Sequence, residues 1–446
     1  MKKTMVSLAA ASLIATTAMA ADKGIDIVTT GQAVLYYETS DNNGKTESVP
    51  GAGDFKDRSS LFHQDSSQAN VGLQLNLDAD LKNNFTFGSQ ISYLGTAGLE
   101  KNLVSNVKQD LGLSTKKDTT GQLALTQIYI AKKIGNTTVK IGRQELPKSL
   151  SPFAYSEGWN VFKNTFDAVL VVNTDIPDTT LVGAYVSGGT GMNLSSTSDL
   201  TPKVNIDGAT TVGGTAYMAT VQNKSIPMTT ITASYYRVAK ISNTSLPATV
   251  VLDGADALWA DVAVAGKDLP LGLKFGLQGG QLSSDSSLVA DTNAFGGKIG
   301  MSPIDALTLC VAFTSVDGDD NKANIAVKNF GTGIKSPLYT QMIYNQDAIA
   351  LDADTFMLKA AYNTGDYGTV TAQYAFTSAG NSNLNTYSVG AVDKGNDYGE
   401  FDLIYSVKAA GVQYFAAYIN RSWDKKDGIN AADTDHRLRV WGRYNF

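Results

Sequence analysis

Residues 436–446 read "HRLRVWGRYNF" and end the chain at Phe446. In steps of two back from Phe446, one face of an extended chain carries Tyr444, Gly442, Val440 and Leu438, and the other carries Asn445, Arg443, Trp441, Arg439 and Arg437. Successive side chains of a β-strand point to opposite sides of the sheet, so this pattern predicts a strand with one apolar and one basic face. A half-buried strand of a soluble protein alternates in the same way. Whether the apolar face meets a protein core or a lipid bilayer therefore depends on the rest of the chain.

The opening stretch "MKKTMVSLAAASLIATTAMA" has the three parts of a secretory signal. Lys2 and Lys3 precede an uncharged apolar run, and Ala18, Met19 and Ala20 form the small-x-small pattern read by signal peptidase. The apolar run is too short for a transmembrane helix, which needs about 20 apolar residues. We predict a cleaved signal peptide (1–20) and a mature chain of 446 − 20 = 426 residues, whose formal charge changes from 36 − 42 = −6 to 34 − 42 = −8.

The composition of the mature chain argues against several classes of protein. No stripe is dense enough in Lys and Arg to neutralise a row of phosphates, so we expect no nucleic-acid partner. Cys310 is the only cysteine, which excludes an intrachain disulfide and a cysteine-based metal site. No Pro-rich, Ser-rich or single-sign linker divides the chain, and no apolar run after the signal is long enough for a transmembrane helix. Abundant Gly and Tyr favour one domain (21–446) built from many short strands.

Segments of alternating polarity recur along the whole chain. In "NVGLQLNLDAD" (70–80), Val71, Leu73, Leu75 and Leu77 alternate with polar residues and glycine. Strands of about 9–11 residues cross a bilayer when they are tilted, and these segments have that length. We count eighteen of them, centred near Val34, Leu73, Phe87, Gln127, Ile141, Leu170, Tyr185, Tyr217, Ser234, Val262, Phe275, Gly297, Val311, Lys359, Thr371, Asp402, Phe415 and Val440.

The connections between these segments alternate between long and short. The short ones are "LKNN", "IGN", "TDIPD", "NKSIP", "AGKDLP", "MSPIDA", "NTGDYG" and "VKAAG". Tight periplasmic turns and longer external loops distinguish transmembrane barrels from soluble sandwiches. An even number of strands also lets the sheet close without an unpaired edge. We therefore predict an all-β transmembrane antiparallel β-barrel of eighteen strands, with sixteen as the alternative, wide enough for an aqueous channel. The apolar face of the last strand then meets lipid, its arginines face the pore, and Phe446 lies at the periplasmic rim.

The stretch "IGRQELPKSLSPFAYSEGWNVFKNTFDAVLVV" (141–172) resembles porins of the OprD type and the major outer-membrane porins of the Campylobacter type. The resemblance implies an eighteen-stranded barrel, often trimeric, whose third external loop folds inward and narrows the channel. The last strand is also similar to the signal read by the outer-membrane barrel assembly machinery. Gly442 departs from that signal, because an apolar side chain is usual at this place.

Two groups of residues are candidates for contact with a solute. Alternation alone places one group inward, because a charge on the lipid face costs up to about 2–4 kcal/mol near the midplane. This group comprises Asp78, Lys140, Asp261, Lys274, Lys359, Glu400, Asp402, Arg437, Arg439 and Arg443. The third loop (147–164) supplies the second group, Lys148, Tyr155, Glu157 and Lys163. The alternatives are that paired charges satisfy one another across strands and that the loop points outward. By simple alternation, the Arg143 side chain points toward lipid near the external rim. Either a bulge redirects it, or it lies at the level of the lipid headgroups.

Two weaker patterns complete the search. Asp317, Asp319 and Asp320 in "VDGDDN" resemble part of a calcium loop, but the glycine at position six and the terminal Glu of an EF-hand loop are missing. A solvated acidic loop is the preferred interpretation, and bridging of lipopolysaccharide by Ca²⁺ or Mg²⁺ is the alternative.

His63 and His436 are the only histidines, and neither belongs to a catalytic motif, so we expect no enzyme and no cofactor.

Together these patterns predict an outer-membrane porin. It would be a passive channel for ions and small hydrophilic solutes with a charge-lined constriction. The net charge of −8 and the acidic loops favour a weak preference for cations, which the three carboxy-terminal arginines oppose. A channel specific for small organic acids or amino acids and a non-conducting structural or adhesin barrel are the alternatives. The expected partners are outer-membrane lipid and lipopolysaccharide, the assembly machinery, and two further copies in a homotrimer.

Overall fold

The computed structural model describes residues 25–42, 60–111, 121–195, 198–200, 202, 213–242, 252–266, 268–287, 289–319, 322–380, 397–423 and 434–446. The predicted signal peptide lies outside these residues. Helical structure among them is limited to four short 3-10 segments, η1 (Gln64–Ser66), η2 (Leu99–Lys101), η3 (Pro270–Gly272) and η4 (Gly365–Tyr367). None of the helices in the described ranges is long and apolar enough to cross a bilayer.

Eighteen strands form one sheet, and all eighteen expected centres lie within them. The strands are β1 (Asp26–Asn42), β2 (Ser67–Lys82), β3 (Phe85–Gly95), β4 (Gln122–Ile134), β5 (Thr137–Gln144), β6 (Phe166–Asn173), β7 (Thr179–Gly189), β8 (Gly213–Asn223), β9 (Thr229–Ser242), β10 (Leu252–Ala265), β11 (Lys274–Ser284), β13 (Thr292–Ile304), β14 (Leu307–Asp317), β16 (Ala353–Asn363), β17 (Thr369–Ala379), β18 (Tyr398–Ala409), β19 (Val412–Trp423) and β20 (Thr434–Asn445). A separate short pair joins β12 (Val289–Ala290) to β15 (Ala323–Asn324).

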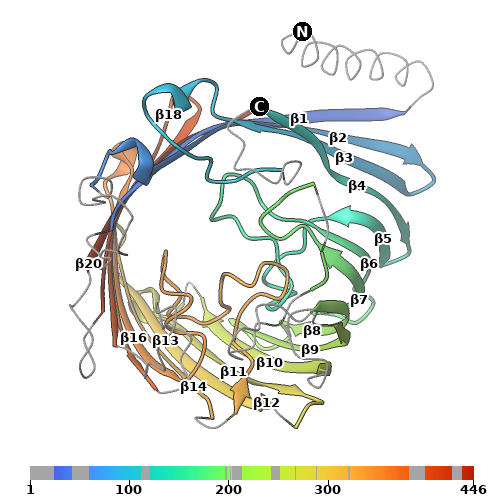
Figure 1. Cartoon of the computed structure of the whole chain (residues 1–446). Helices are drawn as coiled ribbons and strands as arrows, with labels where there is room; N and C mark the ends of the chain where they lie inside the picture. Colours follow the sequence, from blue (N-terminus) through green and yellow to red (C-terminus); the bar gives the residue numbers. More distant parts are fainter. Residues whose placement is uncertain are drawn as a thin grey trace.

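The sheet is closed. Each barrel strand pairs antiparallel with the next one along the chain, and β1 pairs with both β2 and β20. Closure is completed where Gly31 and Phe446 exchange backbone hydrogen bonds with N–O distances of 2.7 and 3.0 Å. The prediction of an eighteen-stranded antiparallel barrel is therefore confirmed, and the alternative of sixteen strands is not. Figure 1 shows the strands arranged as a ring around an interior that several segments cross.

Short turns lie at one end of the barrel and long connections at the other, as the sequence predicted. Asp26 at the start of β1 pairs with Asp80 beside the β2–β3 turn, and Tyr444 in β20 pairs with Val412 beside the β18–β19 turn. The start of β1 and the end of β20 therefore both lie at the short-turn end of the barrel. Four of the long connections supply luminal contacts, and we name them L2 (96–121), L3 (145–165), L4 (190–212) and L7 (318–352).

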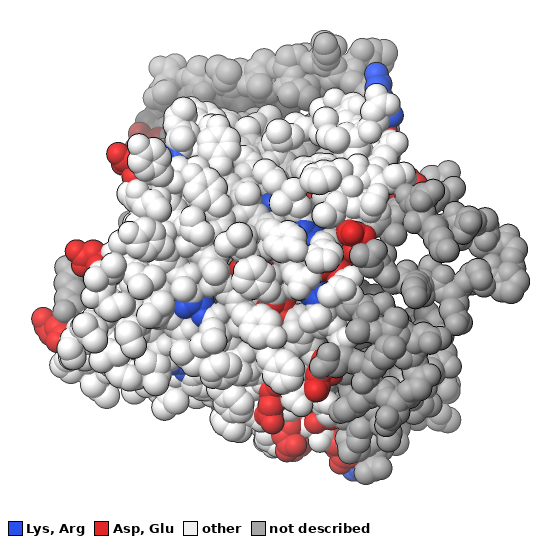
Figure 2. Space-filling view, turned by 90° about the vertical axis from the view of Figure 1, so that its left-hand side faces the viewer, with Lys and Arg blue, Asp and Glu red and all other residues white. Residues whose placement is uncertain are grey.

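The outer face of the wall is apolar and the inner face is polar. Leu277 is 66% exposed and Val440 is 39% exposed, whereas Arg439 between the outward residues of β20 is only 4% exposed. In Figure 2, uncharged residues cover most of one side of the molecule, and Asp and Glu are most frequent near its margins. Gly442 also faces outward, and the Tyr414 ring of the neighbouring strand lies where a Cβ would be 3.6 Å away. The tyrosine thus covers the gap in the apolar face.

L3 and L7 fold into the barrel and pack against the inner wall. The Phe153 ring of L3 stacks on Phe330 of L7 with ring centroids 5.1 Å apart, and it meets Trp259 of β10 and Tyr236 of β9 edge-on. These residues belong to a luminal apolar cluster that also contains Phe166, Leu282 and Leu338. In Figure 1 the teal and orange segments inside the ring are parts of these loops. Much of the lumen beside β6–β11 is therefore filled with protein.

The two faces of β18 allow a direct test of the lipid-facing assignment. Leu403 is exposed on the outside, and its neighbour Ile404 has the inward phase of Asp402. We expect Leu403→Lys to lower the free energy of unfolding by about 2–4 kcal/mol, because it places a charge in hydrocarbon. Ile404→Lys, as the matched control, should lower it much less. Urea titrations in phospholipid vesicles would measure both, and equal losses would contradict the assignment.

Candidate channel constriction

Glu157 of L3 joins the two inward loops. Its carboxylate accepts hydrogen bonds from Asn329 Nδ2 at 2.7 Å, from the Lys335 backbone N–H at 3.1 Å and from the Thr332 hydroxyl, all in L7. Asn164 accepts the backbone N–H of Glu157 itself at 2.7 Å. Glu157 is buried, so its charge is held by donors that would otherwise lack partners. L3 and L7 consequently form one internal body.

Carboxylates on the inner face of the barrel wall bind this internal body. Glu400 and Asp402 of β18 are both buried, and they accept the backbone N–H groups of Tyr344 at 2.8 Å and Ile343 at 3.4 Å. On another part of the wall, the Tyr339 hydroxyl donates to Asp261 of β10. These three carboxylates were predicted to face inward, and here each contacts L7.

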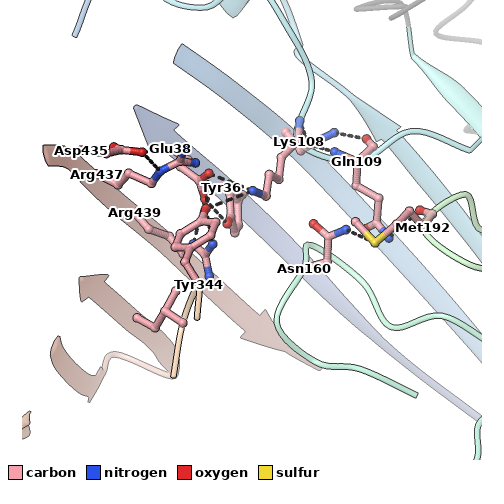
Figure 3. A network of polar contacts seen from close by, with 12 residues as sticks. Tyr36, Glu38, Lys108, Gln109, Asn160, Met192, Tyr344, Asp435, Arg437 and Arg439 are labelled. Atoms are coloured by element: carbon pink, nitrogen blue, oxygen red, sulfur yellow. Dashed lines mark hydrogen bonds and ion pairs between the residues drawn. The ribbon is translucent and has the colours of Figure 1, made fainter. Parts of the chain in front are cut away.

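A dense ionic network connects β1, β19, β20, L2 and L7, and Figure 3 shows most of it. Glu38 of β1 pairs with Lys108 of L2 at 2.8 Å and with Arg439 of β20 at 2.9 Å. Asp435 of β20 pairs with Arg437 at 2.8 Å and also with Arg421 of β19. Lys335 of L7 interacts electrostatically with Arg439 and with three further acids, Glu157 of L3 and Glu400 and Asp402 of β18. Five acids (Glu38, Glu157, Glu400, Asp402 and Asp435) and five bases (Lys108, Lys335, Arg421, Arg437 and Arg439) therefore share this region. Charges of opposite sign that face a narrow passage would orient the dipole of a passing solute.

A second group of luminal cations makes no ion pair with any described residue. It comprises Lys140, Lys148, Lys298, Lys359 and Arg443, and these residues lie from the middle of the wall toward the short turns. Lys140 lies over the Tyr129 ring at 3.5 Å and Lys298 over the Tyr339 ring at 3.8 Å, while Lys148 and Arg443 donate to backbone carbonyls of Ser336 and Val161. Cation–π contacts and neutral acceptors leave the positive charge uncompensated. Asp78 and Asp261 lie at a similar depth and accept from tyrosine hydroxyl groups, so this half of the lumen holds unpaired charges of both signs, with cations in the majority.

The predicted site residues fall into three sets. Tyr155, Glu157, Asp261, Glu400, Asp402, Arg437 and Arg439 belong to the loop contacts and the ionic network, and Tyr155 carries its share through backbone contacts with Asn329. Lys148 and Arg443 lie outside the ionic network but contact the loops at Ser336 and Val161. The remaining predicted residues, Asp78, Lys140, Lys163, Lys274 and Lys359, lie outside both the loop contacts and the network. Asp78 accepts from Tyr129 at 3.1 Å, Lys163 pairs with Glu145 at 2.7 Å, and Lys274 is exposed at the start of β11.

Sequence reasoning missed several members of the network. Glu38, Arg421 and Asp435 share the inward phase of Tyr36, Ile419 and Arg437, so a complete reading of the alternation in β1, β19 and β20 would have found them. Lys108, Lys335, Tyr339 and Tyr344 lie in loops, where no periodicity shows the direction of a side chain. Only the tertiary contacts identify them.

The weaker candidates have ordinary surroundings. The described residues contain no group of three or more His, Cys, Asp or Glu side chains that could hold a metal, and Asp320 lies outside them. Asp317 ends β14, and the Asp319 backbone N–H is bound by Asn324 at 3.0 Å. Arg143 is on the outer side of β5 and pairs in two-point fashion with Asp167 of β6. His436 contacts Tyr418 at 2.7 Å on the outer side of β19–β20.

A closed barrel with an apolar belt outside and charged groups inside has the architecture of a large transmembrane β-barrel. Several solved structures share this fold. Pseudomonas aeruginosa OccK8 (OprE) is 14% identical, covers 94% of this chain and 98% of its own, and has a TM-score of 0.67. P. aeruginosa OpdO is 16% identical over 94% and 97% with a TM-score of 0.66, and Acinetobacter baumannii OccAB3 is 13% identical over 94% and 100% with a TM-score of 0.67. At this identity the likeness establishes the fold alone. No family model and no curated protein sequence matches the chain.

Two loop lysines have pKa values that are lowered from the usual range of lysine. Burial lowers the pKa of Lys335 to about 8, and the neighbouring Arg439 acts in the same direction. Burial also lowers the pKa of Lys148 to about 8, although this residue is more open to the lumen than Lys335. A lysine with a lowered pKa becomes neutral as the pH rises through that value. Both lysines therefore lose positive charge at mildly alkaline pH.

We expect a matching change in ion selectivity. Raising the pH from about 7 to about 9, across the lowered pKa values, should shift the reversal potential in a salt gradient toward cations. The double variant Lys148→Gln/Lys335→Gln should lack most of this shift, since its lysines cannot titrate. An unchanged pH response in the double variant would exclude both lysines as its origin.

Proposed function

We propose that this protein is an outer-membrane porin, a passive diffusion channel for ions and small hydrophilic solutes. The observation that carries the proposal is the closed barrel whose interior presents charged groups of both signs while its outside is apolar. Charged side chains inside a transmembrane wall are costly unless they meet water or one another, and a water-filled passage supplies that environment. A structure titled as an outer membrane protein, opdK of P. aeruginosa, has the same fold at 13% identity and a TM-score of 0.66, which supports the location.

The passage would run between the internal body of L3 and L7 and the wall formed by β18, β19, β20 and β1. On this side the luminal groups are charged, whereas the apolar cluster fills the side of β6–β11. A solute would cross the ionic network first and the group of unpaired cations next. No step requires an energy source, because the solute moves down its own gradient.

Two opposing contributions determine whether the channel prefers cations or anions. The net charge of −8 predicted for the mature chain would enrich cations at the external mouth. The five unpaired cations deeper in the lumen would favour anions. We retain a weak overall preference for cations as the proposal, with the lumen acting against it.

A channel selective for small organic acids or amino acids is the second candidate. The five unpaired luminal cations favour it, because a carboxylate would provide the partner that these side chains lack. A non-conducting structural or adhesin barrel is the third candidate, and the internal body of L3 and L7 is the feature that would block the passage.

Planar-bilayer recording with the purified full chain tests these candidates. Stepwise single-channel currents would support a porin, and their absence would favour the non-conducting barrel. Reduction of the current by millimolar succinate or glutamate, with no effect of a neutral sugar, would favour the channel for organic acids.

The unpaired lysines provide a test of the proposed path. Lys298→Gln/Lys359→Gln should shift the reversal potential in a salt gradient toward cations, because two positive charges leave the lumen. Lys132→Gln is the matched control, since Lys132 lies on the outer face of β4 over the Phe85 ring at 3.9 Å. Equal shifts in the control, or none in the double variant, would place the conducting path elsewhere.

We also propose a homotrimer in the outer membrane, in contact with lipid and lipopolysaccharide and inserted by the barrel assembly machinery through β20. The family resemblance motivates the trimer, and the aromatic end of β20 motivates the insertion route. Mass measurement of the detergent-extracted particle would test the assembly, and a particle of single-chain mass under mild conditions would argue against it.

A further inference from the structure

Tyr344 at the tip of L7 lies among four cations. Its ring centroid is 4.6 Å from Arg437, 5.0 Å from Arg439 and 5.3 Å from Arg421 at their guanidinium carbons, and 5.7 Å from Lys108 Nζ. The arginines come from the wall strands β19 and β20, and the lysine comes from L2. We name these four residues the cation cage. The faces of an aromatic ring carry negative potential, so the ring partly offsets the repulsion among like charges.

The hydroxyl group of Tyr344 adds polar contacts to the same cage. It donates to Glu38 and accepts from Arg439 Nη2 at 2.7 Å and from Lys108 Nζ at 3.3 Å. One phenol therefore satisfies an acid and two bases of the ionic network. Figure 3 shows Tyr344 between the arginines of β20 and the Glu38 end of β1. In this arrangement the tyrosine occupies the space that a small anion would take beside these cations.

Hydrogen bonds and apolar packing hold this part of L7 against the wall. The backbone N–H of Tyr344 is bound by Glu400 at 2.8 Å, and that of Ile343 reaches Asp402 only at 3.4 Å. Lys335 of the same loop donates to the carbonyl groups of Met342 and Ile343 at 3.0 and 2.6 Å. These last bonds fold this part of L7 on itself, and Met342 packs in an apolar cluster with Ala312, Met357 and Ala375 of the wall.

We propose that Tyr344 is a built-in plug of the cation cage, whose side chain narrows the passage along β18–β20 and shields the arginines of the cage from anions. The proposal rests on the channel function proposed above. It assigns to the Tyr344 side chain a role that attachment of L7 does not require, because L7 is also attached to the wall at Asp261, through Met342 and in the apolar cluster. Removal of the ring and the hydroxyl group can therefore change the passage while L7 stays in place.

The test compares single-channel conductance and reversal potential for wild type and three variants of the full chain. Tyr344→Ala removes both the ring and the hydroxyl group, and should raise the conductance and shift the reversal potential toward anions. Tyr344→Leu keeps most of the bulk but neither polar feature, and should shift the reversal potential with a smaller rise in conductance. Leu338→Ala loosens L7 within the apolar cluster, away from the cage, and should cause no shift toward anions.

The possible results separate the two proposals. If wild type conducts and both Tyr344 variants match it, the plug is refuted and the channel stands. If Leu338→Ala reproduces the effect of Tyr344→Ala, general loosening of the loop explains the change and the plug is refuted. If neither wild type nor any variant conducts, both proposals fail. The heat-dependent shift in electrophoretic mobility shows whether each barrel has folded, and Tyr344→Leu provides the result if the alanine variant does not fold.

Discussion

The structure depends on one constraint, that every peptide group in hydrocarbon needs a partner within the chain. The barrel satisfies this constraint by closing, which pairs β1 with β20 from the two ends of the sequence. The pairing runs from Gln32 opposite Asn445 to Asn42 opposite Asp435. The last bonds join Gly31 and Phe446, and a Cβ at position 31 would lie 2.6 Å from the Phe446 ring. A larger residue there would displace the terminal aromatic side chain from the seam. The small residue and the final phenylalanine thus act together.

Closing eighteen strands creates an interior that the inward side chains of the wall cannot fill. L3 and L7 enter it, and their backbones bring donors and acceptors that need partners away from bulk water. Glu157, Glu400 and Asp402 provide many of those partners, as does Asn329. Several charges that face the lumen therefore serve first to hold loops. Removing one of them would move a loop as well as change a charge.

The sequence was sufficient for the wall because the period of two and the alternation of loop lengths are local properties. Val440 and Arg439 show this, since adjacent residues have opposite surroundings. The resemblance at 141–172 also indicated that L3 turns inward. It could not indicate that Tyr344 meets Glu38, because that contact joins a loop to a strand 306 positions away in the chain. Pairings of this kind depend on the barrel closing first, and no short-range pattern encodes them.

In the proposed channel, the distribution of charge matters more to permeation than its sum. At physiological salt, charges are screened beyond about 8 Å, whereas the apolar core of a bilayer is about 30 Å thick. Acidic groups at the external mouth therefore act weakly on an ion near Lys359 or Arg443. Within the ionic network, opposite charges cancel at short range, as Glu38 does with Lys108 and Arg439. Toward the short turns, the five unpaired cations outnumber Asp78 and Asp261, and the low-dielectric wall strengthens the resulting field. A chain with a net negative charge can in this way hold an internal excess of positive charge.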